Sequence, residues 1–145
     1  MKLQQLSVFL ENKPGQLKGA CDLLTKANVN IRTLSLADAK QFGILRLIVP
    51  EWERAKTVLE GGGFVVKTTE VLAIEVADRP GGLAEILTHV EAAGLNVEYM
   101  YAFAFGREGK AVLIFRFDNP DKAIEALRAG GINMVGGVEL YARKS

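Results

Sequence analysis

The sequence has one cysteine, one histidine and one tryptophan, and its charges nearly cancel. A single cysteine, Cys21, can form neither an internal disulfide nor a multi-cysteine metal site, which fits a reducing compartment. Eighteen basic residues against seventeen acidic ones leave a net charge of +1 in 145 residues, whereas nucleic-acid binders usually carry a basic surplus on one face. The composition therefore disfavours nucleic acid as a partner.

Long apolar runs are also missing. None approaches the roughly 20 residues that a membrane-spanning helix needs. Residues 1–7 lack the apolar core of a signal peptide. We therefore expect a cytoplasmic protein with no membrane contact.

Side chains suited to catalysis are scarce. Nucleophilic catalysis needs a histidine beside a nucleophile, but His89 falls within a predicted helix, where a partly exposed structural residue is the simpler interpretation. Cys21 falls on the apolar stripe of another predicted helix, where it serves as a small apolar filler. The sequence has no CxxC, HExxH or acidic ligand cluster, so we expect no metal, no cofactor and no enzymatic activity.

An internal duplication is the strongest signal present. The segment Glu-Asn-Lys-Pro-Gly-Gln-Leu at 11–17 is followed 66 residues later by Ala-Asp-Arg-Pro-Gly-Gly-Leu at 77–83. The same offset carries the apolar stripe of the helix after the first segment onto that of the second, with the spacing of a one-sided amphipathic helix. Repetition at a fixed period indicates two copies of one unit, and we predict domains at 1–69 and 70–145.

Both copies are predicted to have the element order β-α-β-β-α-β. In the first copy we expect strands at 4–10, 29–38, 43–49 and 64–69, helices at 15–26 and from Pro50 to the glycines at 61–63, and a hairpin loop at 39–42. In the second copy we expect strands at 71–76, 95–105, 110–117 and 138–142, helices at 81–93 and from about Pro120 to Gly130, and a frayed tail at 143–145. This order is that of ferredoxin-like folds, so the expected class is α+β with antiparallel sheets.

Each copy has a Pro-Gly turn between its first strand and its first helix. Proline presets φ for a helix start, glycine lets the backbone approach a neighbour, and the first helical N–H groups form a small anion site. The turn residues are Asn12, Lys13, Pro14, Gly15, Gln16 and Leu17 in the first copy and Asp78, Arg79, Pro80, Gly81, Gly82 and Leu83 in the second.

Asn30 and Asn96 open the strands that follow these helices. We expect each of them to begin near the turn of its own copy. Amide and carboxylate groups beside backbone N–H groups suit a zwitterionic α-amino acid. The same residue types also cap and turn the chain for purely structural reasons.

RNA binding is an alternative, because an RNA-recognition fold shares this element order and stacks bases on exposed aromatic residues. Tyr99, Tyr101, Phe103 and Phe105 share one face of a predicted strand. The matching positions of the first copy, 33, 35, 37 and 39, hold small residues, and basic flanks are missing. We therefore interpret the aromatic stripe as packed beneath helices or at an interface.

The doubled turn and the doubled asparagine resemble a tandem ACT-domain protein over essentially the whole chain. The resemblance implies two ACT units packed side by side, commonly in a homodimer, with an amino-acid effector bound where a turn faces a neighbouring unit. Serine-binding members place a histidine two residues before the asparagine of the turn, where this sequence has Leu10 and Val76. A branched-chain or aromatic amino acid is therefore favoured over serine.

The resemblance implies a regulatory module that modulates a separate metabolic enzyme or its own assembly. The two turns differ in sequence, which predicts two sites of unequal affinity, or one functional and one vestigial site. The alternative is a structural or assembly protein that binds a partner protein through its sheet and has lost the ligand. A scaffold of that kind would tolerate substitution of Asp78 or Asn96.

Overall fold

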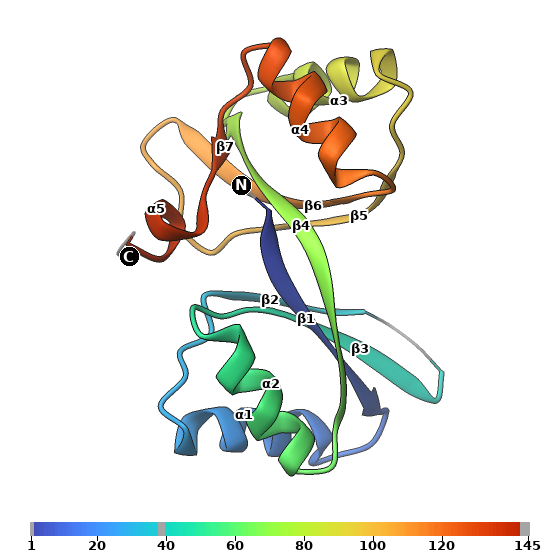
Figure 1. The fold of residues 1–145 in the computed structure, drawn as a ribbon, viewed down its shortest axis with the longest axis vertical. Coiled ribbons are helices and arrows are strands. Elements are labelled where there is room, and N and C mark those ends of the chain that lie inside the picture. The colour runs from blue at the N-terminus through green and yellow to red at the C-terminus, as the bar shows by residue number, and fades with distance from the viewer. Residues whose placement is uncertain (1, 38–39, 143–145) are drawn as a thin grey trace. The chain divides into compact units, whose positions relative to one another are not determined.

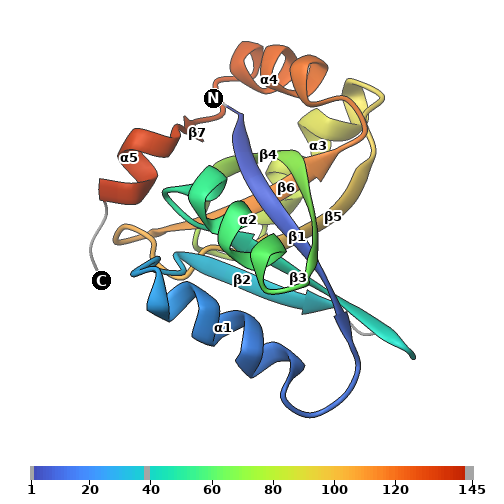
Figure 2. The same cartoon turned by 60° about the horizontal axis from the view of Figure 1, so that its bottom comes forward.

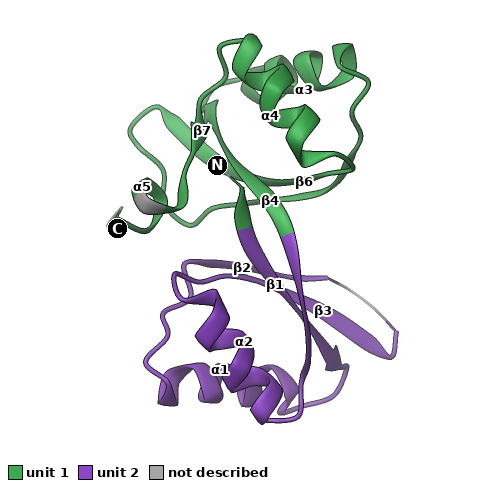
Figure 3. Cartoon of the chain, viewed as in Figure 1, with its two compact units in different colours: residues 1–3, 70–145 green, residues 4–69 purple. Residues whose placement is uncertain are grey.

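A computed structural model, which describes residues 2–37 and 40–142, divides the chain into two compact units. The N-terminal unit is Gln4–Thr69, and the C-terminal unit is Met1–Leu3 with Glu70–Ser145 (Figure 3). Residues 38 and 39 of the expected hairpin loop and the expected frayed tail at 143–145 lie outside the described residues.

The N-terminal unit is a four-stranded antiparallel sheet with two helices on one face (Figure 2). Its elements are β1 (Leu3–Glu11), α1 (Gln16–Lys26), β2 (Thr33–Ala37), β3 (Phe42–Ile48), α2 (Trp52–Gly61) and the first part of β4 (Val65–Ala77). The strand order is β2-β3-β1-β4. The core lies between the helices and the sheet, where Leu24, Leu45 and Leu59 are fully buried.

The C-terminal unit repeats this arrangement, with α3 and α4 over its sheet (Figure 1). Its further elements are α3 (Gly82–Ala92), β5 (Val97–Ala102), β6 (Lys110–Phe117), α4 (Pro120–Ala129), β7 (Met134–Val135) and α5 (Gly137–Ala142). The strand order is β7-β4-β6-β5. Phe115 and Phe117 stack in the core, with ring centroids 5.4 Å apart and ring planes 5° apart.

One strand serves as the last strand of the N-terminal unit and the first strand of the C-terminal unit. β4 runs without interruption over 13 residues, whereas the sequence predicts separate strands at 64–69 and 71–76. The segment Val65–Ala77 is rich in valine and threonine and contains neither glycine nor proline, so nothing in it favours a break.

The last strand of the C-terminal unit lies earlier than predicted. Residues 138–142 belong to α5, and the strand is Met134–Val135, paired with Ile74 and Ala73 of β4. The prediction is wrong because a five-residue apolar segment does not distinguish strand from helix by its spacing.

A polar cluster fixes β7 at its position. The N–H of Glu75 donates to the carbonyl of Asn133 at 3.0 Å, and Asn133 Nδ2 donates to Glu75 Oε1 at 2.6 Å. Arg107 Nη2 lies 2.6 Å from Glu75 Oε2, and the side chain of Glu75 is only 6% exposed. The hydrogen bond from Arg107 to Glu75, together with the negative charge of Glu75, raises the pKa of Arg107. The buried carboxylate of Glu75 therefore has a permanently charged counter-ion.

Local preferences of asparagine and glycine account for several helix ends. Asn119 caps α4, its side chain accepting from the N–H of Lys122 at 3.1 Å. Asn28 and Gly94, which follow the ends of α1 and α3, have φ values of 57° and 68°. Asparagine and glycine tolerate this left-handed conformation best.

The aromatic stripe does not lie beneath the helices of its unit. Met100 pairs with Phe115 and packs against the core, whereas Tyr99 and Tyr101 pair with Arg116 and Ile114. Because side chains alternate along a strand, the two tyrosines project from the face of the sheet opposite to α3 and α4. β5 also ends at Ala102 rather than at the predicted residue 105.

Candidate functional site

The two Pro-Gly turns follow the same backbone course. In each turn one backbone N–H donates to a carbonyl of the neighbouring hairpin. The N–H of Asn12 donates to Gln41 at 2.8 Å, and the N–H of Asp78 donates to Gly109 at 3.0 Å. Gly15 and Gly81 cap the helices at φ 89° and 85°, values that glycine reaches without strain. Each helix begins at the residue after this glycine, so Pro14 and Pro80 precede the helices instead of occupying their first positions.

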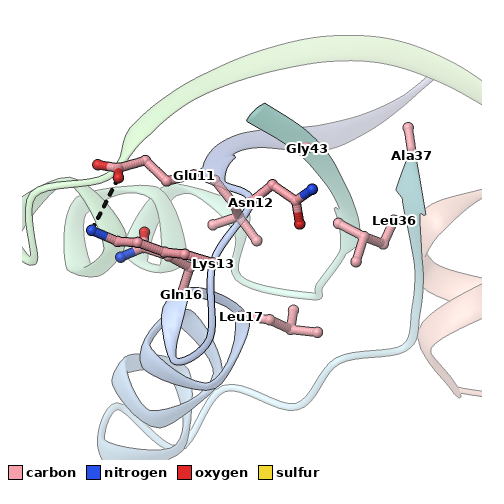
Figure 4. Close-up of a pocket in the computed structure, with 9 residues that line it drawn as sticks. Glu11, Asn12, Lys13, Gln16, Leu17, Leu36, Ala37 and Gly43 are labelled. Atoms are coloured by element: carbon pink, nitrogen blue, oxygen red, sulfur yellow. Dashed lines mark ion pairs between the residues drawn. The ribbon is translucent and has the colours of Figure 1, made fainter. Parts of the chain in front are cut away.

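A cavity of about 280 Å³ opens at the turn of the N-terminal unit. It is bounded by the end of β1, the first turn of α1, the end of β2 and the start of β3 (Figure 4). Its lining residues are Leu10, Glu11, Asn12, Lys13, Gln16, Leu17, Leu36, Ala37 and Gly43. The structure thus brings four predicted site residues, Asn12, Lys13, Gln16 and Leu17, together around one space.

The cavity joins a charged region to an apolar wall. Lys13 Nζ lies 3.0 Å from Glu11 Oε2, and Asn12 Nδ2 donates to the carbonyl of Lys40 at 3.4 Å. Leu17 and Leu36 project into the space between α1 and β2 (Figure 4). One positive group, one negative group and an amide therefore stand beside apolar surface.

Sequence reasoning missed the strand residues of this wall. Leu36, Ala37 and Gly43 reach the turn because β3 pairs with both β1 and β2, with Leu10 opposite Gly43 and Ile44 opposite Ala37. The register that brings them there is a property of the folded sheet. The run of exposed leucines in β2, Leu34 and Leu36, is the signal that could have indicated an open apolar surface.

The turn of the C-terminal unit holds different side chains. Gly82 takes the position of Gln16, and Ala111, opposite Val76, takes that of Gly43, opposite Leu10. Ala102 corresponds to Leu36. Leu36 pairs with Leu45, two residues after Gly43, and Ala102 pairs with Leu113, two residues after Ala111. Arg79 is paired with Glu85 at 2.6 Å.

Comparison with known families decides what kind of chain this is. Residues 1–142 match the family described as ACT domain pair. The chain belongs to the ACT domain pair family. Such pairs are regulatory, amino-acid-binding modules without catalytic activity of their own, and the α+β class with two βαββαβ ACT repeats is confirmed.

Solved ACT structures resemble this chain over most of its length. Protein BT0572 from Bacteroides thetaiotaomicron is 37% identical, with a TM-score of 0.91 over 99% of this chain and 98% of that one. The ligand-free regulatory subunit of aspartate kinase from Thermus thermophilus is 15% identical, with a TM-score of 0.65 over 88% and 90% of the two chains. Aspartate kinase from Clostridium acetobutylicum is 11% identical, with a TM-score of 0.57 over 88% of this chain and 32% of its own. No curated protein matches the chain.

The two strand-opening asparagines of this ACT pair do not lie at the turns of their own units. β2 starts at Thr33 opposite Ile48 and reaches the turn only at its other end, Ala37. Because α1 returns the chain to the edge where β1 starts, the parallel strand β2 begins at that edge, and Asn30 lies there too. The expectation that Asn30 begins beside its turn is therefore wrong.

Asn96 follows the same rule in the second ACT unit. Its N–H donates to Asp118 Oδ1 at 3.1 Å, and the N–H of Asp118 donates back to its carbonyl at 3.2 Å. Asp118 follows the end of β6, whereas the turn at Asp78 bonds to Gly109 before its start. A role of Asn30 and Asn96 in ligand binding remains a prediction.

Within residues 2–37 and 40–142, no group of three or more His, Cys, Asp and Glu side chains could hold a metal ion. His89 and Cys21 are half-buried on α3 and α1, and Cys21 is a free thiol. No helix among these residues is long and apolar enough to cross a membrane.

The start of α3 lies close to the end of its strand at the second ACT turn. A Cβ added to Gly82 would lie 2.0 Å from the carbonyl oxygen of Ala77, a backbone atom that cannot move aside alone. We expect Gly82→Ala to cost roughly 1–3 kcal/mol of unfolding free energy by overpacking, measured by urea denaturation. The matched variant Gln16→Ala should cost less, because that position already holds a Cβ. Equal losses in the two variants would show that the two turns are equally open.

Proposed function

We propose that this ACT domain pair binds a free α-amino acid with a branched-chain or aromatic side chain at the turn of the N-terminal unit. The cavity beside Asn12 is the observation that supports this proposal. It presents charged groups, an amide and apolar surface within one space of about 280 Å³. A ligand that carries a carboxylate, an ammonium group and an apolar side chain complements all three.

Different residues of the cavity would bind the carboxylate and the ammonium group of the ligand. The ammonium of Lys13 and the first N–H groups of α1 attract the ligand carboxylate, since those N–H groups have no partner within the helix. The carboxylate of Glu11 and the amide oxygen of Asn12 accept from the ligand ammonium. Binding would open the Glu11–Lys13 ion pair, and an exposed pair of this kind contributes at most about 1 kcal/mol.

The apolar wall supports a ligand larger and less polar than serine. Leu10, Leu17 and Leu36 line the cavity, and Gly43 adds no side chain to it. A serine hydroxyl would find no polar side chain among these four. An aliphatic or aromatic side chain would remove apolar surface from water, at about 25 cal/mol per Å².

Ligand binding would act on a separate enzyme or on the assembly of this chain with a second copy. One neighbour of the same fold is the regulatory subunit of aspartate kinase, which supports a separate enzyme as the partner. A ligand that binds one conformation or assembly better than another shifts the population toward it, with couplings of roughly 1–3 kcal/mol. The exposed side chains of Leu34 and Phe42 favour an assembly role as the second candidate function.

Thermal unfolding against all twenty L-amino acids at millimolar concentration tests the proposal. At 100 times its dissociation constant a ligand adds about 2.7 kcal/mol, which raises the midpoint by roughly 5–10 °C. We expect this rise with L-leucine, L-isoleucine, L-valine or an aromatic amino acid, and none with L-serine or D-leucine. If all twenty leave a cooperative midpoint unchanged, amino-acid binding is refuted and the assembly role takes its place.

A further inference from the structure

The two ACT turns share a backbone course but differ in the space they leave. Both have the same left-handed glycine cap and the same hydrogen bond to the neighbouring hairpin. They differ in their side chains and in the approach of the helix to the strand. The ability of the first turn to hold a ligand can therefore be compared directly with that of the second turn.

The first difference is the distance between helix and strand. At Gly82 the backbone of α3 lies so close to Ala77 that even a methyl group would collide with its carbonyl. At the matching position of α1, Gln16 carries a full side chain and lines the cavity. A side chain therefore lines the space beside the strand end in the N-terminal unit, whereas the close approach of α3 leaves no room for one at Gly82 in the C-terminal unit.

The second difference is the wall contributed by the second strand of each unit. Leu36 lines the cavity although it is 54% exposed, so its side chain forms apolar surface that nothing in its own unit requires. The matching residue, Ala102, ends at Cβ and leaves no such wall. A ligand side chain that contacts Leu36 at the first turn would lose this contact at the second.

From these two differences we propose that the chain binds one amino acid, at the first turn only, and that Leu36 is the residue that makes this turn selective for apolar side chains. The inference rests on the proposed function and deepens it. The second turn serves to pack α3 against β4. Arg79, which the sequence predicts as a ligand residue, forms an ion pair with Glu85 of α3.

Isothermal titration of the full chain with L-leucine and with L-phenylalanine tests this inference. We expect one molecule bound per chain. Leu36→Ala, which gives the first turn the residue of the second, should weaken binding about 10-fold or more, because the ligand loses an apolar contact. Arg79→Ala should leave affinity and stoichiometry unchanged. Both side chains are largely exposed, and an unchanged thermal midpoint without ligand confirms that each variant folds.

Each other result overturns a stated part. Two molecules per chain, or binding that survives Leu36→Ala and fails in Arg79→Ala, contradicts the single first-turn site. L-leucine binding that Leu36→Ala leaves unchanged contradicts the role of Leu36 in selectivity. If the unaltered chain binds neither probe and no amino acid shifts its midpoint, the proposed function itself fails, and the inference falls with it.

Discussion

Gly43→Leu should raise the dissociation constant for the bound amino acid by roughly 100-fold or more, about 2.7 kcal/mol. Gly43 lies in β3 opposite Leu10, on the side of the sheet that faces α1, and it lines the cavity. A Cβ there would contact Leu36 Cδ1 and the carbonyl of Ala37, both at 3.4 Å. The remaining atoms of a leucine would extend into the space that the ligand needs. Isothermal titration with L-leucine or L-phenylalanine measures the effect.

Ala111→Leu is the matched control for this substitution. Ala111 occupies the corresponding position of β6, opposite Val76, in the C-terminal unit. It should leave the dissociation constant unchanged. A ligand that binds Gly43→Leu as tightly as the unaltered chain would show that the cavity is not its site, provided that the variant keeps its thermal midpoint in the absence of ligand.

Phe115→Ala should lower the free energy of unfolding by about 3–5 kcal/mol, the usual cost of removing a buried phenylalanine ring. Phe115 is fully buried and stacks on Phe117 in the core of the C-terminal unit. Neighbouring side chains can only partly fill the space left by the ring. Because domains are stable by only about 5–15 kcal/mol, the variant should unfold at a much lower urea concentration.

Phe42→Ala provides the comparison, since it removes the same ring from a position that is 54% exposed. Its effect should stay within roughly 0.5 kcal/mol, as for most surface substitutions. Similar losses in the two variants would mean that Phe42 is buried in solution by an assembly of copies. A loss below about 1 kcal/mol in Phe115→Ala would mean that the core closes around the missing ring.

The sequence reveals most of the fold because the duplication supplies two independent views of each element. The apolar spacing predicts helices α1 and α3 correctly, although Leu83 and Leu87 of the second stripe are exposed and only Ile86 and Val90 are buried. The caps at Asn28, Gly94 and Asn119 follow from local conformational preferences of asparagine and glycine. The turn residues Asn12, Lys13, Gln16 and Leu17 are found from the same repeat, and they do line the cavity.

The errors arise where the answer depends on which segments meet in space. Asn30 and its turn are joined through α1, and only the direction of the parallel strands shows that they lie at opposite edges. Leu36 and Gly43 become neighbours of the turn through strand register, which no local pattern encodes. Met134–Val135 is too short to show a period, and its pairing is fixed by Glu75, a residue nearly sixty positions earlier in the chain.

The uninterrupted strand β4 contributes side chains to both cores, so one alternation of side chains has to serve both. Val66 points into the core of the N-terminal unit, and Leu72, Ile74 and Val76 point into the core of the C-terminal unit. All four are even-numbered, so a single alternation of side chains satisfies both units. Gaining or losing one residue between them would turn one set of apolar side chains away from its core. A single-residue insertion within this strand would therefore need a β-bulge to restore the alternation on both sides of it.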